Sequence, residues 1–148
     1  MSASLSAALA AQQAPTTYPE FRADAIIATG TTVQGGVGVV VPAGLYARIG
    51  LDGGFGTRWR EGSSSAVGRV DVIARFLLDP IRENDVGFSI GGGLSAPIDA
   101  GGFRTPYLTL VADVEGRRRG GFTPAVELGL GGGARIGFVL RRSPPRWR

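Results

Sequence analysis

Residues 45–59 read LYARIGLDGGFGTRW, and two kinds of residue alternate along the whole stretch. The odd positions are mainly apolar and the even positions are mainly glycine or charged: Leu45, Ala47, Ile49, Leu51, Gly53, Phe55, Thr57 and Trp59 alternate with Tyr46, Arg48, Gly50, Asp52, Gly54, Gly56 and Arg58. Successive side chains of a β-strand point to opposite faces of the sheet. The stretch therefore predicts a strand with one apolar face and one face of glycine and charge.

The same alternation extends over most of the chain and predicts an all-β, antiparallel fold. It recurs in residues 22–41, 67–78, 86–96, 106–115 and 122–140. Counting each alternation as one strand gives six strands. Three-residue turns at 30–32 and 131–133 would preserve the parity and give eight strands, so the sequence leaves both counts open.

Composition excludes several classes of function. The 148 residues correspond to about one domain. The chain contains no His and no Cys, so it lacks the commonest acid–base group and the thiolate metal ligand. No apolar run approaches the ~20 residues that a membrane-spanning helix needs. We therefore predict that the protein is not an enzyme, has no cofactor or metal site, and has no transmembrane helix.

The two ends of the chain differ in composition from the alternating part. Residues 1–21 are predicted to be a signal-peptide remnant followed by a linker, because an Ala-rich apolar run precedes small residues and two prolines. Residues 143–148 are predicted to be a basic tail. The net charge is +4, and its surplus lies in a turn at 117–119 and near the C-terminus. These arginines are expected in solvated loops, with contact to lipid headgroups as the alternative.

Glycine on the polar face indicates what the two faces contact. A soluble, lipocalin-like barrel would hold a small apolar ligand inside and would carry long polar side chains outside. Glycine weakens a strand unless something approaches closely or the sheet bends sharply, and both conditions hold inside a narrow barrel. The polar face therefore points inward and the apolar face contacts lipid. The glycines of this face are Gly50, Gly54, Gly56, Gly87, Gly91, Gly93, Gly129, Gly131, Gly133 and Gly137.

Charged residues on the same face are nearly balanced, which predicts a mutually paired network in the interior. An unpaired ion away from water is expensive, so such a network needs both signs. Six apolar residues also fall on this face and are expected near strand ends or filling interior gaps: Ile26, Val40, Ile73, Leu77, Val111 and Val139. The predicted network consists of Arg48, Asp52, Arg69, Asp71, Arg75, Asp113, Glu115, Glu127 and Arg135.

With these features the chain resembles the small outer-membrane β-barrel proteins, which include the OmpA-type transmembrane domain and the opacity-like surface proteins. The resemblance covers residues 22–142 and implies an up-and-down transmembrane barrel of about eight strands, with six as the alternative. It also implies export to the outer membrane, no large pore, and a structural or surface-interaction role. The expected partners are outer-membrane lipids and, through the loops, lipopolysaccharide or another surface partner; nucleic acid is not expected.

Two further features bear on this resemblance. The loops 60–65 and 97–104 are expected on the outer side, and the tight turn 42–44 on the periplasmic side. Members of the family usually end their last strand with an aromatic residue at the chain end, whereas here Phe138 is followed by Leu140 and the basic tail. A soluble lipocalin-like barrel that binds a small apolar ligand is the alternative function.

Overall fold

The computed structural model describes residues 17–81 and 85–142. The Ala-rich part of the predicted signal-peptide remnant and the predicted basic tail lie outside these residues. No helix in the described part of the chain is long and apolar enough to cross a membrane. The strands are β1 (Tyr18–Ile27), β2 (Thr31–Pro42), β3 (Ala47–Arg60), β4 (Ser63–Leu77), β5 (Gly87–Asp99), β6 (Gly102–Phe103), β7 (Tyr107–Glu115), β8 (Phe122–Leu130) and β9 (Ala134–Arg142).

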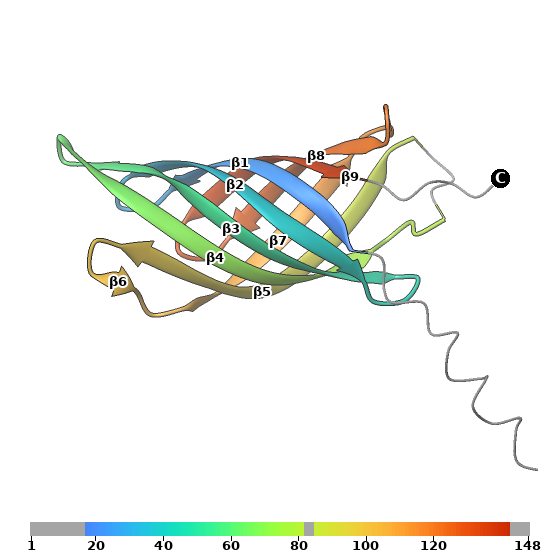
Figure 1. Cartoon of the computed structure of the whole chain (residues 1–148), viewed down its shortest axis with the longest axis horizontal. Coiled ribbons are helices and arrows are strands. Elements are labelled where there is room, and N and C mark those ends of the chain that lie inside the picture. Colours follow the sequence, from blue (N-terminus) through green and yellow to red (C-terminus); the bar gives the residue numbers. More distant parts are fainter. Residues whose placement is uncertain (1–16, 82–84, 143–148) are drawn as a thin grey trace, which may run out of the picture.

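Eight of these strands close into one antiparallel barrel (Figure 1). Each long strand pairs with the next one along the chain, and β1 pairs with β9 to complete the ring. The ninth strand, β6, has two residues and extends only the end of β5. Closure pairs the edges that an open sheet would leave exposed. The count of eight is therefore confirmed, and the alternative of six is wrong.

Short turns explain why six alternations contain eight strands. Three residues separate Ile27 from Thr31, and these two residues face each other across the β1–β2 ladder. The same spacing separates Leu130 from Ala134 in the β8–β9 ladder. A three-residue turn keeps the parity of the alternation, so the sequence pattern runs through it unchanged. The first turn comprises residues 28–30, two residues earlier than expected.

Three predicted boundaries are wrong. The predicted loop 97–104 is partly strand, because β5 runs to Asp99 and β6 covers Gly102–Phe103. Residues 60–65 do not form a loop, because β3 runs to Arg60 and β4 begins at Ser63. Only Glu61 and Gly62 turn the chain, both with positive φ (49° and 78°). The barrel also begins at Tyr18 instead of Arg22, so residues 18–21 belong to β1 and not to a linker.

The connections at the two ends of the barrel differ from the expected arrangement. The turn between Pro42 and Ala47 lies at the barrel end where β1 begins and β9 ends, which we call the end with the termini. Residues 60–65 and 97–104 lie at the opposite end, as expected (Figure 1). However, the longest connection, residues 78–86, also lies at the end with the termini. The opposite end carries mostly turns of two or three residues. The longer loops are therefore not gathered at the end away from the termini.

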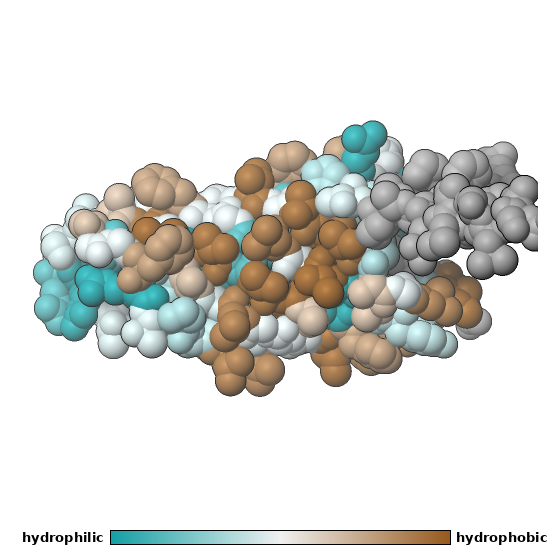
Figure 2. All heavy atoms as spheres, turned by 60° about the horizontal axis from the view of Figure 1, so that its bottom comes forward, coloured by the Kyte–Doolittle hydropathy of each residue, from teal (hydrophilic) through white to brown (hydrophobic). Residues whose placement is uncertain are grey.

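Apolar side chains cover the outside of the barrel, as the alternation predicts. Figure 2 shows that they gather over the middle of the wall, while hydrophilic residues lie at the end that carries the β3–β4 turn. Leu51, Phe55 and Leu128 are 51%, 69% and 56% exposed. By contrast, the interior apolar residues Ile73 and Val139 are fully buried. The soluble alternative is therefore wrong, because it requires the apolar face inside.

Aromatic side chains lie near both borders of the apolar belt. Tyr46 stacks on Phe76 next to the termini, with ring centroids 5.9 Å apart. Trp59, 13 residues further along, lies near the other border and is 48% exposed. At ~3.3 Å per residue and a strand tilt of about 45°, the separation across a bilayer is about 30 Å, which equals the hydrocarbon thickness. Aromatic rings at such borders are typical of membrane interfaces.

Candidate functional site: the charged interior

The interior of the barrel contains a network of thirteen charged side chains, seven acidic and six basic. Its formal charge is therefore −1, and the rest of the chain carries +5, which gives the net charge of +4. All thirteen are buried except Arg48, whose side chain is 12% exposed. The network consists of Glu20, Arg22, Asp24, Arg48, Asp52, Arg69, Asp71, Arg75, Asp113, Glu115, Glu127, Arg135 and Arg141.

All nine residues predicted for this network face the interior, and each makes an ion pair there. The strand pattern missed four members. Glu20 was assigned to a linker and Arg141 to the C-terminal basic cluster. Arg22 and Asp24 lie in the predicted first strand, but they were not identified as interior charges. The parity of the first strand already places Arg22 and Asp24 inside, and the same parity extended by one or two residues at each end of the barrel includes Glu20 and Arg141.

Glu127 of β8 is the centre of the network. Its Oε1 accepts hydrogen bonds from Arg22 (2.6 Å) and from Arg135 (2.7 Å), and its Oε2 accepts one from Arg75 (2.5 Å). The three arginines come from β1, β9 and β4, so one carboxylate joins both sides of the barrel. Hydrogen bonds between ionised groups are about twice as strong as neutral ones.

Arg141 of β9 organises the part of the network nearest the termini. Its guanidinium donates to Glu20 (2.5 Å), to Glu115 (2.8 Å) and to Asp113 (3.1 Å). Arg48 donates to Glu115 as well, so two arginines share this carboxylate. Four strands are thus joined at this end: β1, β3, β7 and β9.

Asp24 and Asp71 organise the part furthest from the termini. Arg69 contacts both, at 2.6 Å to Asp24 and 2.9 Å to Asp71. Asp71 also accepts hydrogen bonds from Arg135 (2.9 Å) and from Ser95 of β5 (2.5 Å). The three parts together connect every long strand except β2 through side-chain contacts.

Glycine provides the space that these side chains occupy, and β2 contributes mainly in this way. Gly38 of β2 lies between Glu20 and Asp52 in the ladder, and a Cβ there would clash with the carboxylate of Asp52. A Cβ at Gly50 would lie 2.9 Å from Nη1 of Arg75. At these two positions glycine is therefore required by the charged side chains of the neighbouring strands.

Several buried polar atoms of the network make no hydrogen bond in the described barrel, and two of them lie close together. Nη1 of Arg22 lies 3.2 Å from Asp52 and 3.5 Å from Glu20, so it approaches both carboxylates. Within the described barrel, the other Asp52 oxygen, Oδ1, and Glu20 Oε1 accept no hydrogen bond. Two incompletely paired carboxylates therefore lie on either side of Gly38 in the ladder. No group of three or more acidic residues in the described segments has the arrangement of a metal site.

Comparison with known proteins identifies the fold. The structure is similar to a de novo designed transmembrane β-barrel, with a TM-score of 0.59, 15% sequence identity and coverage of 88% of this chain and 97% of the other. The chain has the fold of a small transmembrane β-barrel. It is also similar to the N-terminal β-barrel domain of Pseudomonas aeruginosa OprF, an OmpA-type barrel, with a TM-score of 0.56, 12% identity and coverage of 87% and 99%. No protein-family model and no curated protein sequence matches the chain.

Proposed function

We propose that this protein is an exported outer-membrane β-barrel with a structural or surface-interaction role, without catalytic activity and without a large pore. The observation that carries the proposal is the reversed arrangement of the barrel, with apolar side chains outside and paired ions inside. Monomeric soluble proteins rarely expose contiguous apolar patches of more than a few hundred Å². Backbone polar groups in hydrocarbon must pair internally, and the closed ladder meets this requirement.

The end with the termini is proposed to face the periplasm. An exported chain inserts by moving one end of each hairpin across the membrane. The connections at the other end, 28–30, 61–62, 100–106 and 131–133, contain fewer charged residues than 43–46, 78–86 and 116–121. Crossing with them therefore moves fewer polar groups. Polar groups are costly in hydrocarbon, so this orientation has the lower barrier.

The interior is proposed to exclude solutes larger than a few water molecules. Arg75, Ile73, Val139 and Glu127 are fully buried inside the barrel. An eight-stranded barrel is just wide enough for side chains to fill it. The ion pairs around Glu127 connect opposite walls, and opening a channel through them would require several to break together.

The surface role is assigned to the end away from the termini. Residues 58–65 form the tip of the β3–β4 hairpin, and residues 97–104 include the short strand β6. Asp99 accepts hydrogen bonds from Arg104 (2.7 Å) and from the amide of Gly101 (2.9 Å), which hold the second tip in place. Arg58, Arg60 and Arg104 make this end suitable for contact with the phosphates of lipopolysaccharide.

Cysteine labelling tests location and orientation together, because the native chain contains no cysteine. Ser64→Cys places a thiol at the exposed β3–β4 tip, and Ala43→Cys places one in the exposed β2–β3 turn. A membrane-impermeant thiol reagent applied to intact cells is expected to label the first variant and not the second. Both should fractionate with outer membranes and migrate anomalously on gels unless boiled. Recovery in the soluble fraction would refute the membrane assignment, and the reverse labelling would refute the orientation.

A second measurement tests the closed interior. Vesicles containing the protein should retain a trapped disaccharide as well as protein-free vesicles do. Release of the sugar at a rate that scales with the amount of folded protein would show that the interior is open.

A further inference from the structure

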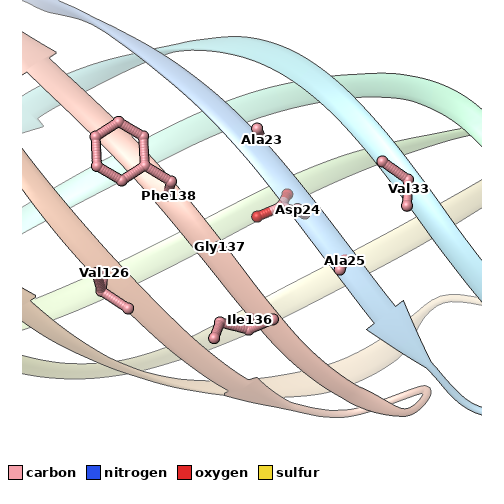
Figure 3. A pocket seen from close by; sticks show the side chains of 8 residues that line it. All are labelled: Ala23, Asp24, Ala25, Val33, Val126, Ile136, Gly137 and Phe138. Atoms are coloured by element: carbon pink, nitrogen blue, oxygen red, sulfur yellow. The ribbon is translucent and has the colours of Figure 1, made fainter.

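A shallow apolar groove crosses the outer wall of the barrel where β1 lies beside β9 (Figure 3). Its volume is about 350 Å³. Ala23 and Ala25 of β1 face outward and form its floor, because each side chain is a single methyl group. Ala23 lies opposite Phe138 and Ala25 opposite Ile136 in the β1–β9 ladder. Larger apolar side chains from the three neighbouring strands surround this floor: Val33, Val126, Ile136 and Phe138.

Two arginines lie beyond the groove, toward the end with the termini. Arg119 bridges to Phe122, and Phe122 pairs with Arg142 in the β8–β9 ladder, so the three residues form one row across the strands. Both arginines are exposed. Arg142 shares its outward parity with Phe138, which lines the groove. No carboxylate among residues 17–81 and 85–142 forms an ion pair with either arginine.

The distance from the groove to the arginines corresponds to one leaflet of a bilayer. Ile136 and Arg142 are six positions apart, which corresponds to about 20 Å along β9 at 3.3 Å per residue. A strand tilt of about 45° makes this about 14 Å along the membrane normal, compared with about 15 Å for half of the hydrocarbon core. The groove therefore ends near the bilayer midplane, while the arginines lie at the height of the headgroups.

We propose that this groove and arginine pair form a binding site for one anionic glycerophospholipid. An acyl chain lies over Ala23 and Ala25, and Arg119 and Arg142 contact the lipid phosphate. Positive charge at the headgroup level complements the lipid, and the apolar groove complements its chain. The inference rests on the proposed membrane location. It assigns the site to the periplasmic leaflet, so the ligand is a phospholipid and not lipopolysaccharide.

Native mass spectrometry of the detergent-extracted protein tests the site. Equal concentrations of dioleoyl phosphatidylglycerol and dioleoyl phosphatidylcholine are added, and bound lipid is counted. Each arginine near a headgroup is expected to contribute about five-fold to the preference for the anionic lipid, and the pair about thirty-fold. The Arg119→Gln/Arg142→Gln double variant should lose this preference, while Arg60→Gln at the other end of the barrel should keep it.

A second variant tests the groove separately from the charge. Ala25→Leu fills the floor and should weaken the binding of both lipids equally. Ala112→Leu, at another outward position of the wall, should change neither. Inorganic phosphate at the same concentration as the lipid should not compete, because it has no chain to occupy the groove; competition by phosphate would assign the arginines to a free-anion site.

The result that would overturn the inference is an unchanged lipid preference in the double variant, or unchanged lipid binding in Ala25→Leu. Each variant is first tested for heat-modifiable gel mobility and for insertion into vesicles. Failure of the native chain to insert would refute the proposed function itself. Normal insertion without lipid preference would refute only the binding site.

Discussion

Replacing Glu127 by glutamine should destabilise the barrel far more than replacing Asp52 by asparagine. Both substitutions remove one negative charge from the interior, so they have the same effect on its formal balance. They differ in the contacts removed: Glu127 accepts three hydrogen bonds from three arginines, at 2.5–2.7 Å. Asp52 accepts one, at 3.2 Å, and its other oxygen accepts none.

The expected magnitudes follow from these contacts. Removing one partner from a buried ion cluster costs about 3–5 kcal/mol, because the remaining charges stay buried without compensation. We expect this range for Glu127→Gln. For Asp52→Asn we expect a cost of about 1 kcal/mol or less, the contribution of a single modest hydrogen bond. The difference of at least about 2 kcal/mol corresponds to roughly a thirty-fold change in the ratio of folded to unfolded protein.

The assay is urea unfolding of the protein in vesicles, in which folded and unfolded bands are separated by gel mobility without boiling. The midpoint and slope give the free energy of unfolding for each variant. If the two variants differ by less than about 0.5 kcal/mol, or if Asp52→Asn is the more damaging, net interior charge and not local pairing governs stability. The central role of Glu127 would then be wrong.

Three further substitutions test other parts of the structure by the same unfolding assay. Gly56→Ala should lower the free energy of unfolding by about 1–3 kcal/mol, because the new Cβ would clash with the Val33 carbonyl. The control Gly53→Ala, on the outer face of the same strand, should cause no measurable loss, because a Cβ there meets nothing within 4 Å. Leu51→Arg should lower the free energy of unfolding in a bilayer by about 2–4 kcal/mol. Ser64→Arg lies beyond the apolar belt and should change this free energy by close to zero. Equal losses would contradict the position of the belt. Tyr46→Ala should lower the free energy of unfolding by about 0.5–1.5 kcal/mol, because it removes the stack on Phe76. Leu45→Ala, a neighbour outside the stack, is the control. An equal loss in both variants would show that the ring pair contributes nothing specific.

The sequence was sufficient to predict the two faces of the wall, because period-two alternation is a local property. Residues 45–59 alternate without a break, and their charged members all lie inside or at the strand end. The ends of the barrel were less predictable. Pro19 favours a linker when read alone, but it lies in β1 beyond the residues that pair with β9, where a missing amide is tolerated.

The partners within the interior could not be predicted from the alternation. Which arginine reaches Glu127 depends on how far the strands are staggered around the ring, and the sequence contains no direct record of that stagger. Arg22 lies 105 residues before Glu127 and Arg135 only 8 residues after it, yet both contact the same oxygen. The groove was missed for a similar reason, since it arises from two alanines lying beside large residues of other strands.

The pairing of Glu20 with Arg141, 121 residues apart, has a consequence for the order of assembly. Until the last strand is synthesised, Glu20 lacks its hydrogen bond from Arg141, and Glu127 lacks the one from Arg135. A chain that stops before β9 would expose uncompensated ions and two open edges at once. Insertion is therefore expected to be concerted, with no stable intermediate that carries seven strands.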